Sequence, residues 1–209
     1  MLLEEHFLYI PLANGTMQCV DITSMTSLWQ SESFGGQSLS TTFYQDGYLY
    51  AGTTNVLSNG TTTGLFYCLN AKDGSTVWTY EDTDHPGGYY WSGAIVYEDA
   101  LFFTGDNGIL VSHSLTEPVV YDTAVLTTTA NIRAGLSYHK ETDALYTVAK
   151  TVHYFRYNAR SKKSQRFPPV KLWVVPILLP APVHQPFITI VYMLDVWQTN
   201  MAMSVLWIP

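Results

Sequence analysis

Two stretches of the sequence share one pattern at a fixed spacing: "CVDITSMTSLW" (residues 19–29) and "CLNAKDGSTVW" (residues 68–78). Each begins with Cys, has Asp or Asn two residues later, and ends with Trp ten residues after the Cys. Both the Cys and the Trp recur with an offset of 49 residues. A period of this size is typical of propellers and solenoids, in which one supersecondary unit recurs along the chain.

Further copies of the unit lie around these two stretches. Apolar and aromatic segments that end in a turn occur four times: "FLYIPLANG" (7–15), "YLYAGTTNV" (48–56), "LFFTGDNGI" (101–109) and "LYTVAKTVH" (145–153). Three of them follow another short alternating segment: "STTFYQD" (40–46), "SGAIVYED" (92–99) and "AGLSYHKE" (134–141). Asn-Gly and Asp-Gly pairs separate the segments, as hairpin turns require. The unit is therefore predicted to be a meander of four antiparallel strands.

The fold that this repeat predicts is all-β: a partial, open β-propeller of about four four-stranded antiparallel blades, followed by an irregular C-terminal tail. We expect the propeller over residues 1–158, with blades at about 6–32, 40–81, 92–127 and 132–158. The insertion "TTNVLSNGTTTG" (53–64) is expected to lengthen one hairpin of the second blade. No segment before residue 158 has helical periodicity.

The repeat resembles that of pyrroloquinoline-quinone (PQQ)-type β-propellers, whose motif is Ala-x-Asp-x-x-x-Gly-x-x-x-Trp after a strand of the type (V/L)Y(V/A)G. This family includes quinoprotein alcohol dehydrogenases and the BamB-type outer-membrane assembly lipoproteins. The best copy has Cys68 at the Ala position and Asn70 at the Asp position, with Gly74 and Trp78 in place.

The other copies depart from the motif. The first keeps Asp21 and Trp29 but has Met25 where Gly is expected. The third, residues 109–123, has lost both Gly and Trp, and Tyr121 is our candidate for the Trp position. A Trp on an outer strand can cover its own blade and lean on the next, so we assign the aromatic motif residues a packing role rather than a ligand role.

The resemblance implies a ring of seven or eight blades, of which this sequence supplies four. It also implies a function: a non-catalytic scaffold for protein or ligand binding at the bacterial cell envelope or surface. The alternative is a fragment of a PQQ-dependent oxidoreductase. Those enzymes have a vicinal disulfide, whereas Cys19 and Cys68 lie 49 residues apart. We therefore expect no PQQ, favour a protein that is not an enzyme, and transfer no catalytic residue.

The charge distribution bears on partners and location. One basic residue, Lys72, stands against fourteen acidic residues before Arg133, a net charge of about −13. Such a surface repels phosphate backbones, so nucleic acid is not expected as a partner. We expect the parent protein to be periplasmic, cell-surface or secreted, although "MLLEEHFLYI" (1–10) does not read as a signal peptide.

One loop, "YEDTDHPGGYYWSG" (80–93), combines acidic, imidazole and aromatic side chains. Three of them could hold calcium or another cation: Asp82, Asp84 and His85. Three aromatic residues could stack on a sugar or peptide, which gives carbohydrate or cell-wall glycan binding as a weaker alternative function: Tyr89, Tyr90 and Trp91. The simpler interpretation, which we favour, is an acidic surface connection.

The C-terminal region differs from the rest. All fourteen glycines lie at or before Gly135, whereas seven of the ten prolines follow Asn158. Four prolines interrupt the apolar run of residues 171–197, so a transmembrane helix is not expected. Codons read in a shifted frame permit "PAVYNDRVYVG" from His184 onward, which is again a propeller strand pair. Our hypothesis is that residues 159–209 are frameshifted sequence and poorly structured.

Overall fold

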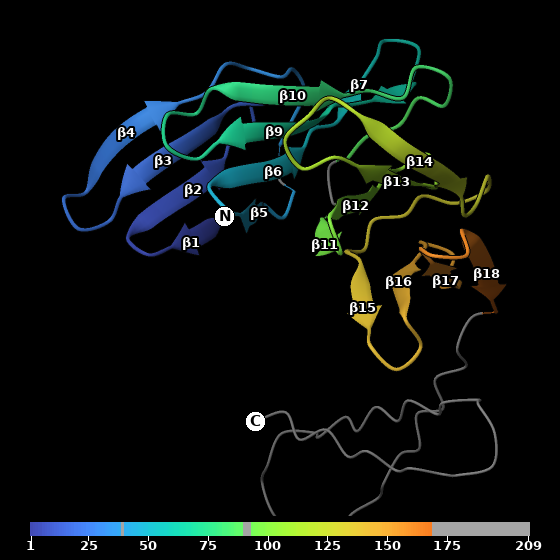
Figure 1. The fold of residues 1–209 in the computed structure, drawn as a ribbon. Helices are drawn as coiled ribbons and strands as arrows, with labels where there is room; N and C mark the ends of the chain where they lie inside the picture. Colours follow the sequence, from blue (N-terminus) through green and yellow to red (C-terminus); the bar gives the residue numbers. More distant parts are fainter. Residues whose placement is uncertain (39, 90–92, 169–209) are drawn as a thin grey trace, which may run out of the picture. The chain divides into compact units, whose positions relative to one another are not determined.

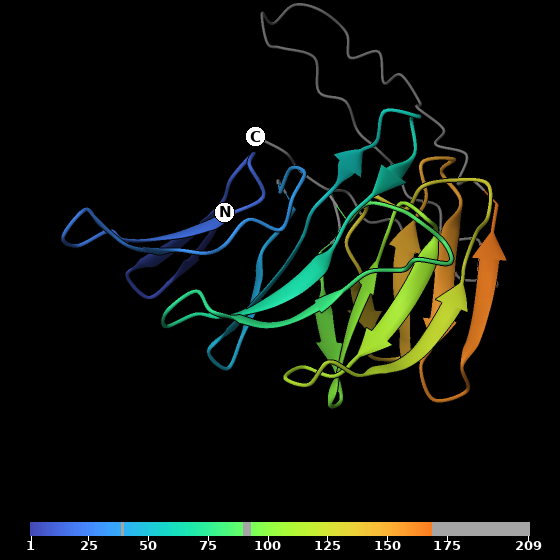
Figure 2. The ribbon, with the colours of Figure 1, turned by 90° about the horizontal axis from the view of Figure 1, so that it is seen from above.

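The computed structural model describes residues 1–38, 40–89 and 93–168, and residues 1–167 form one compact unit. The described part of the chain is all-β and contains no helix, which confirms the predicted class. Within these described ranges, four four-stranded antiparallel sheets follow one another along the chain, and they do not close into a ring (Figure 1). Each sheet is one blade, and in Figure 2 the four blades follow the colour bar from blue to orange.

The strands of the four blades are short, and most contain five residues. The first blade contains β1 (Leu2–Glu4), β2 (Phe7–Pro11), β3 (Met17–Asp21) and β4 (Thr26–Gln30). The second contains β5 (Phe43–Gln45), β6 (Tyr48–Gly52), β9 (Phe66–Asn70) and β10 (Thr76–Tyr80). The third contains β11 (Ile95–Tyr97), β12 (Ala100–Thr104), β13 (Ile109–His113) and β14 (Val120–Val125). The fourth contains β15 (Ser137–His139), β16 (Ala144–Val148), β17 (Tyr154–Asn158) and β18 (Lys163–Phe167).

The insertion in the second blade is a hairpin of its own. β7 (Asn55–Val56) pairs with β8 (Thr62–Thr63) between β6 and β9. The structure thus confirms that residues 53–64 extend one hairpin. Gly60 has a positive φ of 82° in this turn, and a residue without Cβ adopts such a backbone at little cost.

Alternation along the central strands builds a core between consecutive blades. In β6, Leu49 and Ala51 belong to the core shared with the first blade, whereas Tyr50 belongs to the core shared with the third. In β12, Phe103 faces the second blade and Phe102 the fourth. Because side chains of a strand point alternately to its two faces, one five-residue strand serves two interfaces. Both faces of the inner blades are therefore apolar, as the sequence pattern requires.

A bulge in the outer strand pair sets the register of the motif residue. Trp29 pairs with Cys19, and Trp78 pairs with Cys68 in the second blade. At the same register in the third blade, Asp122 pairs with Ser112. The prediction that Tyr121 replaces the Trp is therefore wrong. Tyr121 is the bulged residue, and its side chain is 54% exposed.

The fourth blade extends past the expected limit at residue 158, because β18 pairs with β17 over Lys163–Phe167. The sequence pattern does not mark this strand, because β18 is polar and lacks the Trp of the motif. The preceding "NARSKK" (158–163) nevertheless matches "NAKDGS" (70–75) of the second blade at its first two positions. Residues 169–209, which carry most of the predicted irregular tail and frameshift, lie outside the described residues. Over the described ranges, no helix is long and apolar enough to cross a membrane.

Candidate functional site

The first junction between blades is joined by two hydrogen bonds to one carbonyl. The Tyr9 hydroxyl and Trp29 Nε1 both donate to the carbonyl oxygen of Ala71, at 3.5 and 3.2 Å. Ala71 lies in the turn between β9 and β10 of the second blade. A tyrosine of the second strand and a tryptophan of the fourth strand thus bind the next blade together.

The second junction repeats this arrangement. The Tyr50 hydroxyl and Trp78 Nε1 donate to the carbonyl oxygen of Leu115, at 3.3 and 2.8 Å. Leu115 lies in the turn between β13 and β14 of the third blade. The His113 ring lies 4.0 Å from the Trp78 ring between centroids, and burial lowers the pKa of His113. Each tryptophan thus donates a hydrogen bond to the next blade and also packs against a tyrosine of its own blade.

The third junction has neither donor. Phe102 stands at the position of Tyr9 and Tyr50, and Asp122 stands at the position of the tryptophans; neither side chain can donate to the carbonyl of Ala159. A hollow of about 370 Å³ lies here instead. Residues of both blades line it, among them Phe102, Ser112, Tyr121, Ala159, Tyr97 and Arg160.

Other contacts hold the third and fourth blades together. Lys162 Nζ lies 3.3 Å from Asp122 Oδ2, and the Tyr157 hydroxyl lies 3.4 Å from the same oxygen. Lys162 occupies the turn position that Gly74 has in the second blade. At the first junction the Trp29 ring lies directly against Gly74. At the third junction an ion pair between Asp122 and Lys162 takes the place of this contact.

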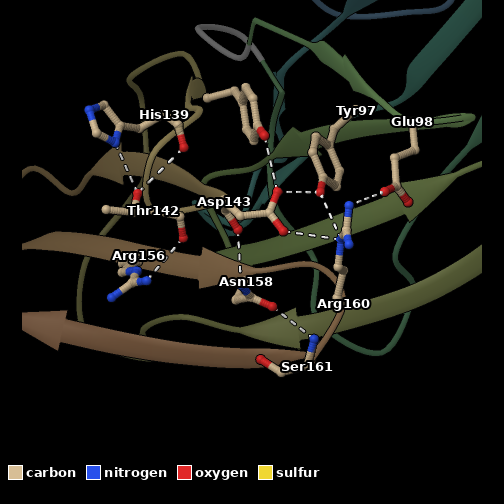
Figure 3. A network of polar contacts seen from close by, with 10 residues as sticks. Tyr97, Glu98, His139, Thr142, Asp143, Arg156, Asn158, Arg160 and Ser161 are labelled. Carbon is tan, nitrogen blue, oxygen red and sulfur yellow. Dashed lines mark hydrogen bonds and ion pairs between the residues drawn. The ribbon is translucent and has the colours of Figure 1, made fainter.

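Figure 3 shows a polar network centred on Asp143. Three residues of this network line the hollow: Tyr97, Glu98 and Arg160. Asp143 Oδ1 accepts hydrogen bonds from the hydroxyls of Tyr97 and Tyr138, at 2.5 and 3.0 Å. Arg160 Nε lies 3.1 Å from Asp143 Oδ2, and Arg160 Nη2 lies 3.1 Å from Glu98 Oε1. The guanidinium group is thus fixed between two carboxylates.

The network shifts the pKa values of its members in the directions that hydrogen bonding dictates. Hydrogen bonds from Tyr97 and Tyr138 lower the pKa of Asp143, and the nearby charge of Arg160 acts in the same direction. The bond to Asp143 raises the pKa of Tyr97. Each donor stabilises the ionised form of the Asp143 carboxylate.

The predicted cation site is only partly assembled. His85 Nδ1 lies 3.5 Å from Asp82 Oδ1, and the His85 amide donates to the same oxygen at 2.8 Å. Asn107 donates to the His85 carbonyl at 2.9 Å, which joins this loop to the β12–β13 turn. Among the described residues, however, no group of three or more His, Cys, Asp or Glu side chains could hold a metal ion. The structure thus brings Asp82 and His85 together without placing the exposed Asp84 beside them as a third ligand.

The predicted aromatic surface needs a correction. Tyr89 is 1% exposed, and its ring packs edge-on against Phe66, Tyr80 and Phe103 in the core between the second and third blades. Its ring cannot stack on a sugar, because the loop turns inward at two buried glycines before it. Tyr90 and Trp91 lie outside the described residues.

The residues around the hollow were not predicted as a site. Asp122, Asp143 and Arg160 come from three different turns and strands, and no local motif joins them. One signal was present for Arg160: in "NARSKK" (158–163) it follows the Asn-Ala pair as Lys72 does in "NAKDGS" (70–75).

The comparisons with known proteins support the fold. No family model and no curated protein matches the chain. The computationally designed Ika8 protein is similar at 9% identity and a TM-score of 0.65, over 91% of this chain and 53% of that chain. BamB from Moraxella catarrhalis is similar at 13% identity and a TM-score of 0.61, over 76% of this chain and 45% of that chain. The designed Ika4 protein gives 9% identity and a TM-score of 0.53, over 80% and 88% of the two chains.

At these identities the likeness shows a propeller-like fold alone. The chain spans about half the length of the Ika8 and BamB chains that it matches.

Proposed function

We propose that the chain is a non-catalytic PQQ-like β-propeller scaffold that binds a protein partner at the bacterial cell envelope or surface, outside the cytoplasm. One observation carries the proposal. The first two junctions are sealed by tyrosine and tryptophan side chains of the chain itself, whereas the third junction opens a hollow lined by aromatic and charged residues. Concave sites with apolar walls and a few fixed polar groups are where proteins bind ligands.

The turn geometry supports assignment to the PQQ-like repeat. Asp21 Oδ1 accepts the amides of Thr23 and Ser24 at 2.7 and 3.2 Å. In the same turn of the second blade, Asn70 Oδ1 accepts the amide two residues later. In the fourth blade, Asn158 Oδ1 accepts the amide three residues later. The Asp or Asn of the motif therefore forms the turn between the third and fourth strands. The BamB likeness in fold agrees with this assignment and suggests the cell envelope as the location.

The residues present do not fit PQQ. Cys19 and Cys68 are buried free thiols in two different blades, so the chain offers no vicinal disulfide. Burial raises the pKa of the Cys68 thiol to about 12, so this thiol is uncharged at neutral pH. Both cysteines behave as small apolar core residues.

Site-specific photo-cross-linking tests the proposed scaffold function. A photoreactive phenylalanine derivative at Tyr121, on the rim of the hollow, should give one discrete cross-linked protein when the chain is exported to a bacterial periplasm. The same derivative at Met25, 78% exposed in the first blade, is the matched control and should give none. Equal, diffuse labelling from both positions would contradict a partner-binding scaffold. Saturable PQQ binding in the presence of calcium would favour an oxidoreductase instead.

A further inference from the structure

The first two junctions define what the third one lacks. At the first junction three residues meet the Trp29 side chain: Tyr9, Cys19 and Ala71. The residues at the same three positions of the third junction all line the hollow: Phe102, Ser112 and Ala159. The hollow therefore adjoins the place that the chain's own tryptophan has at the other junctions, where the ion pair of Asp122 and Lys162 lies at this one.

The walls of the hollow suit a flat aromatic ring. The Phe102 ring and the half-buried Tyr97 ring provide apolar surface. The Arg160 guanidinium, fixed by Asp143 and Glu98 (Figure 3), provides a cation beside them. A guanidinium held near an aromatic face attracts the ring through the ring's quadrupole. The volume of about 370 Å³ lies within the usual range of roughly 300–1,000 Å³ for ligand sites.

The polar groups of the hollow call for a hydrogen-bond donor. At the other two junctions the equivalent carbonyls, of Ala71 and Leu115, accept an indole N–H and a phenol. At the third junction Phe102 and Asp122 leave the carbonyl of Ala159 without either donor. The carboxylates of Glu98 and Asp99 also border the hollow and disfavour an anionic ligand.

We propose that the hollow between the third and fourth blades binds a tryptophan side chain of a partner protein, with the indole N–H donating to the carbonyl oxygen of Ala159. The bound ring then reproduces in trans what Trp29 and Trp78 do within the chain. This proposal rests on the proposed scaffold function and names its binding site. Buried tryptophans anchor many protein interfaces, because one ring gives a large contact area and one directed donor.

Calorimetric titration with N-acetyl-tryptophanamide tests the site directly. Saturable binding at millimolar concentration is expected for the full chain. The 1-methyl analogue, which lacks the indole donor, should bind about fivefold more weakly, in keeping with the loss of one hydrogen bond. N-acetyl-tyrosinamide at equal or higher affinity would overturn the assignment to tryptophan.

Substitutions locate the binding. Asp122→Trp supplies the missing ring in cis and should abolish titration. Val125→Trp is the control, because Val125 is exposed on the same strand and does not line the hollow. Ser112→Leu fills part of the hollow and leaves Asp122 unchanged. It should also abolish binding, and it serves as the test if Asp122→Trp does not fold. Unchanged binding by folded Asp122→Trp or by Ser112→Leu would overturn the proposal.

The two proposals can fail separately. A discrete cross-link from position 121 without indole binding would retain the scaffold and reject the tryptophan site. Indole binding without any cross-linked partner would retain the site's chemistry but would reject the envelope-scaffold function.

Discussion

Trp29 of the first blade lies directly against Gly74 of the second. A Cβ added to Gly74 would stand 2.4 Å from Cε3 of Trp29, and Gly74 has a φ of +73°. The glycine of one repeat thus makes room for the tryptophan of the repeat before it. Within the motif "CLNAKDGSTVW" (68–78), Gly74 therefore serves the first junction and Trp78 the second.

Gly74→Ala should reduce the free energy of unfolding by roughly 2–4 kcal/mol. About 1 kcal/mol comes from the positive φ, and the remainder from the overlap of the new Cβ with the tryptophan ring. Urea unfolding followed by circular dichroism measures the change.

Gly47→Ala is the matched control for this prediction. Gly47 also has a positive φ, of +85°, but a Cβ there meets nothing within 4 Å. Gly47→Ala should therefore reduce the free energy of unfolding by only about 1 kcal/mol. If both substitutions cost the same, the Trp29 contact contributes nothing and the explanation by packing is wrong.

Val152→Gly should stabilise the protein. Val152 occupies the positive-φ position of the β16–β17 turn with φ of 61°, where the first and third blades have Gly15 and Gly108. A β-branched residue is strained in this region by about 1–2 kcal/mol, and Val152 is 55% exposed, so little packing is lost. We expect a gain of about 1 kcal/mol in urea unfolding.

The control for this substitution lies on the adjacent strand. Val148 is 43% exposed at the end of β16. Its φ is not positive, so glycine relieves no strain there and has a lower β-propensity than valine. Val148→Gly should destabilise by about 0.5–1 kcal/mol. Stabilisation by both changes would mean that Val152 is not strained.

His113 should make stability depend on pH near neutrality. Burial lowers its pKa in the folded state, whereas the unfolded value is about 6.5. Between these two values the unfolded chain binds more protons, so the free energy of unfolding falls as the pH drops below about 6.5. His113→Phe keeps a ring on Trp78 and should flatten the profile between pH 7.5 and 5; an unchanged profile would assign the slope to other groups.

The sequence predicted the all-β class and the four meanders because alternation and turn residues are local signals. It did not predict the hollow, because that site depends on register between blades. Asp122 follows Ser112 by ten residues, the spacing that separates Trp29 from Cys19, and the bulge that skips Tyr121 also occurs in the first two blades. The spacing thus pointed to Asp122, but the search for an aromatic residue at this position selected Tyr121. The burial of Tyr89 was also missed, since three consecutive aromatics resemble a surface patch until the path of the loop is known.

Asp143 should stabilise the third junction above about pH 4 and lose this effect in acid. Hydrogen bonds from Tyr97 and Tyr138 lower its pKa in the folded state, whereas the unfolded value is about 3.9. Its contribution is therefore complete above the unfolded pKa and is lost as the pH falls through the folded pKa. Asp143→Asn should be less stable than the original chain at pH 6, and the difference should shrink between pH 4 and pH 2. Tyr97→Phe removes the strongest donor to Asp143 and should reduce the loss of stability in acid. If Asp143→Asn differs from the original chain by the same free energy of unfolding at every pH, the tyrosines do not stabilise an ionised carboxylate.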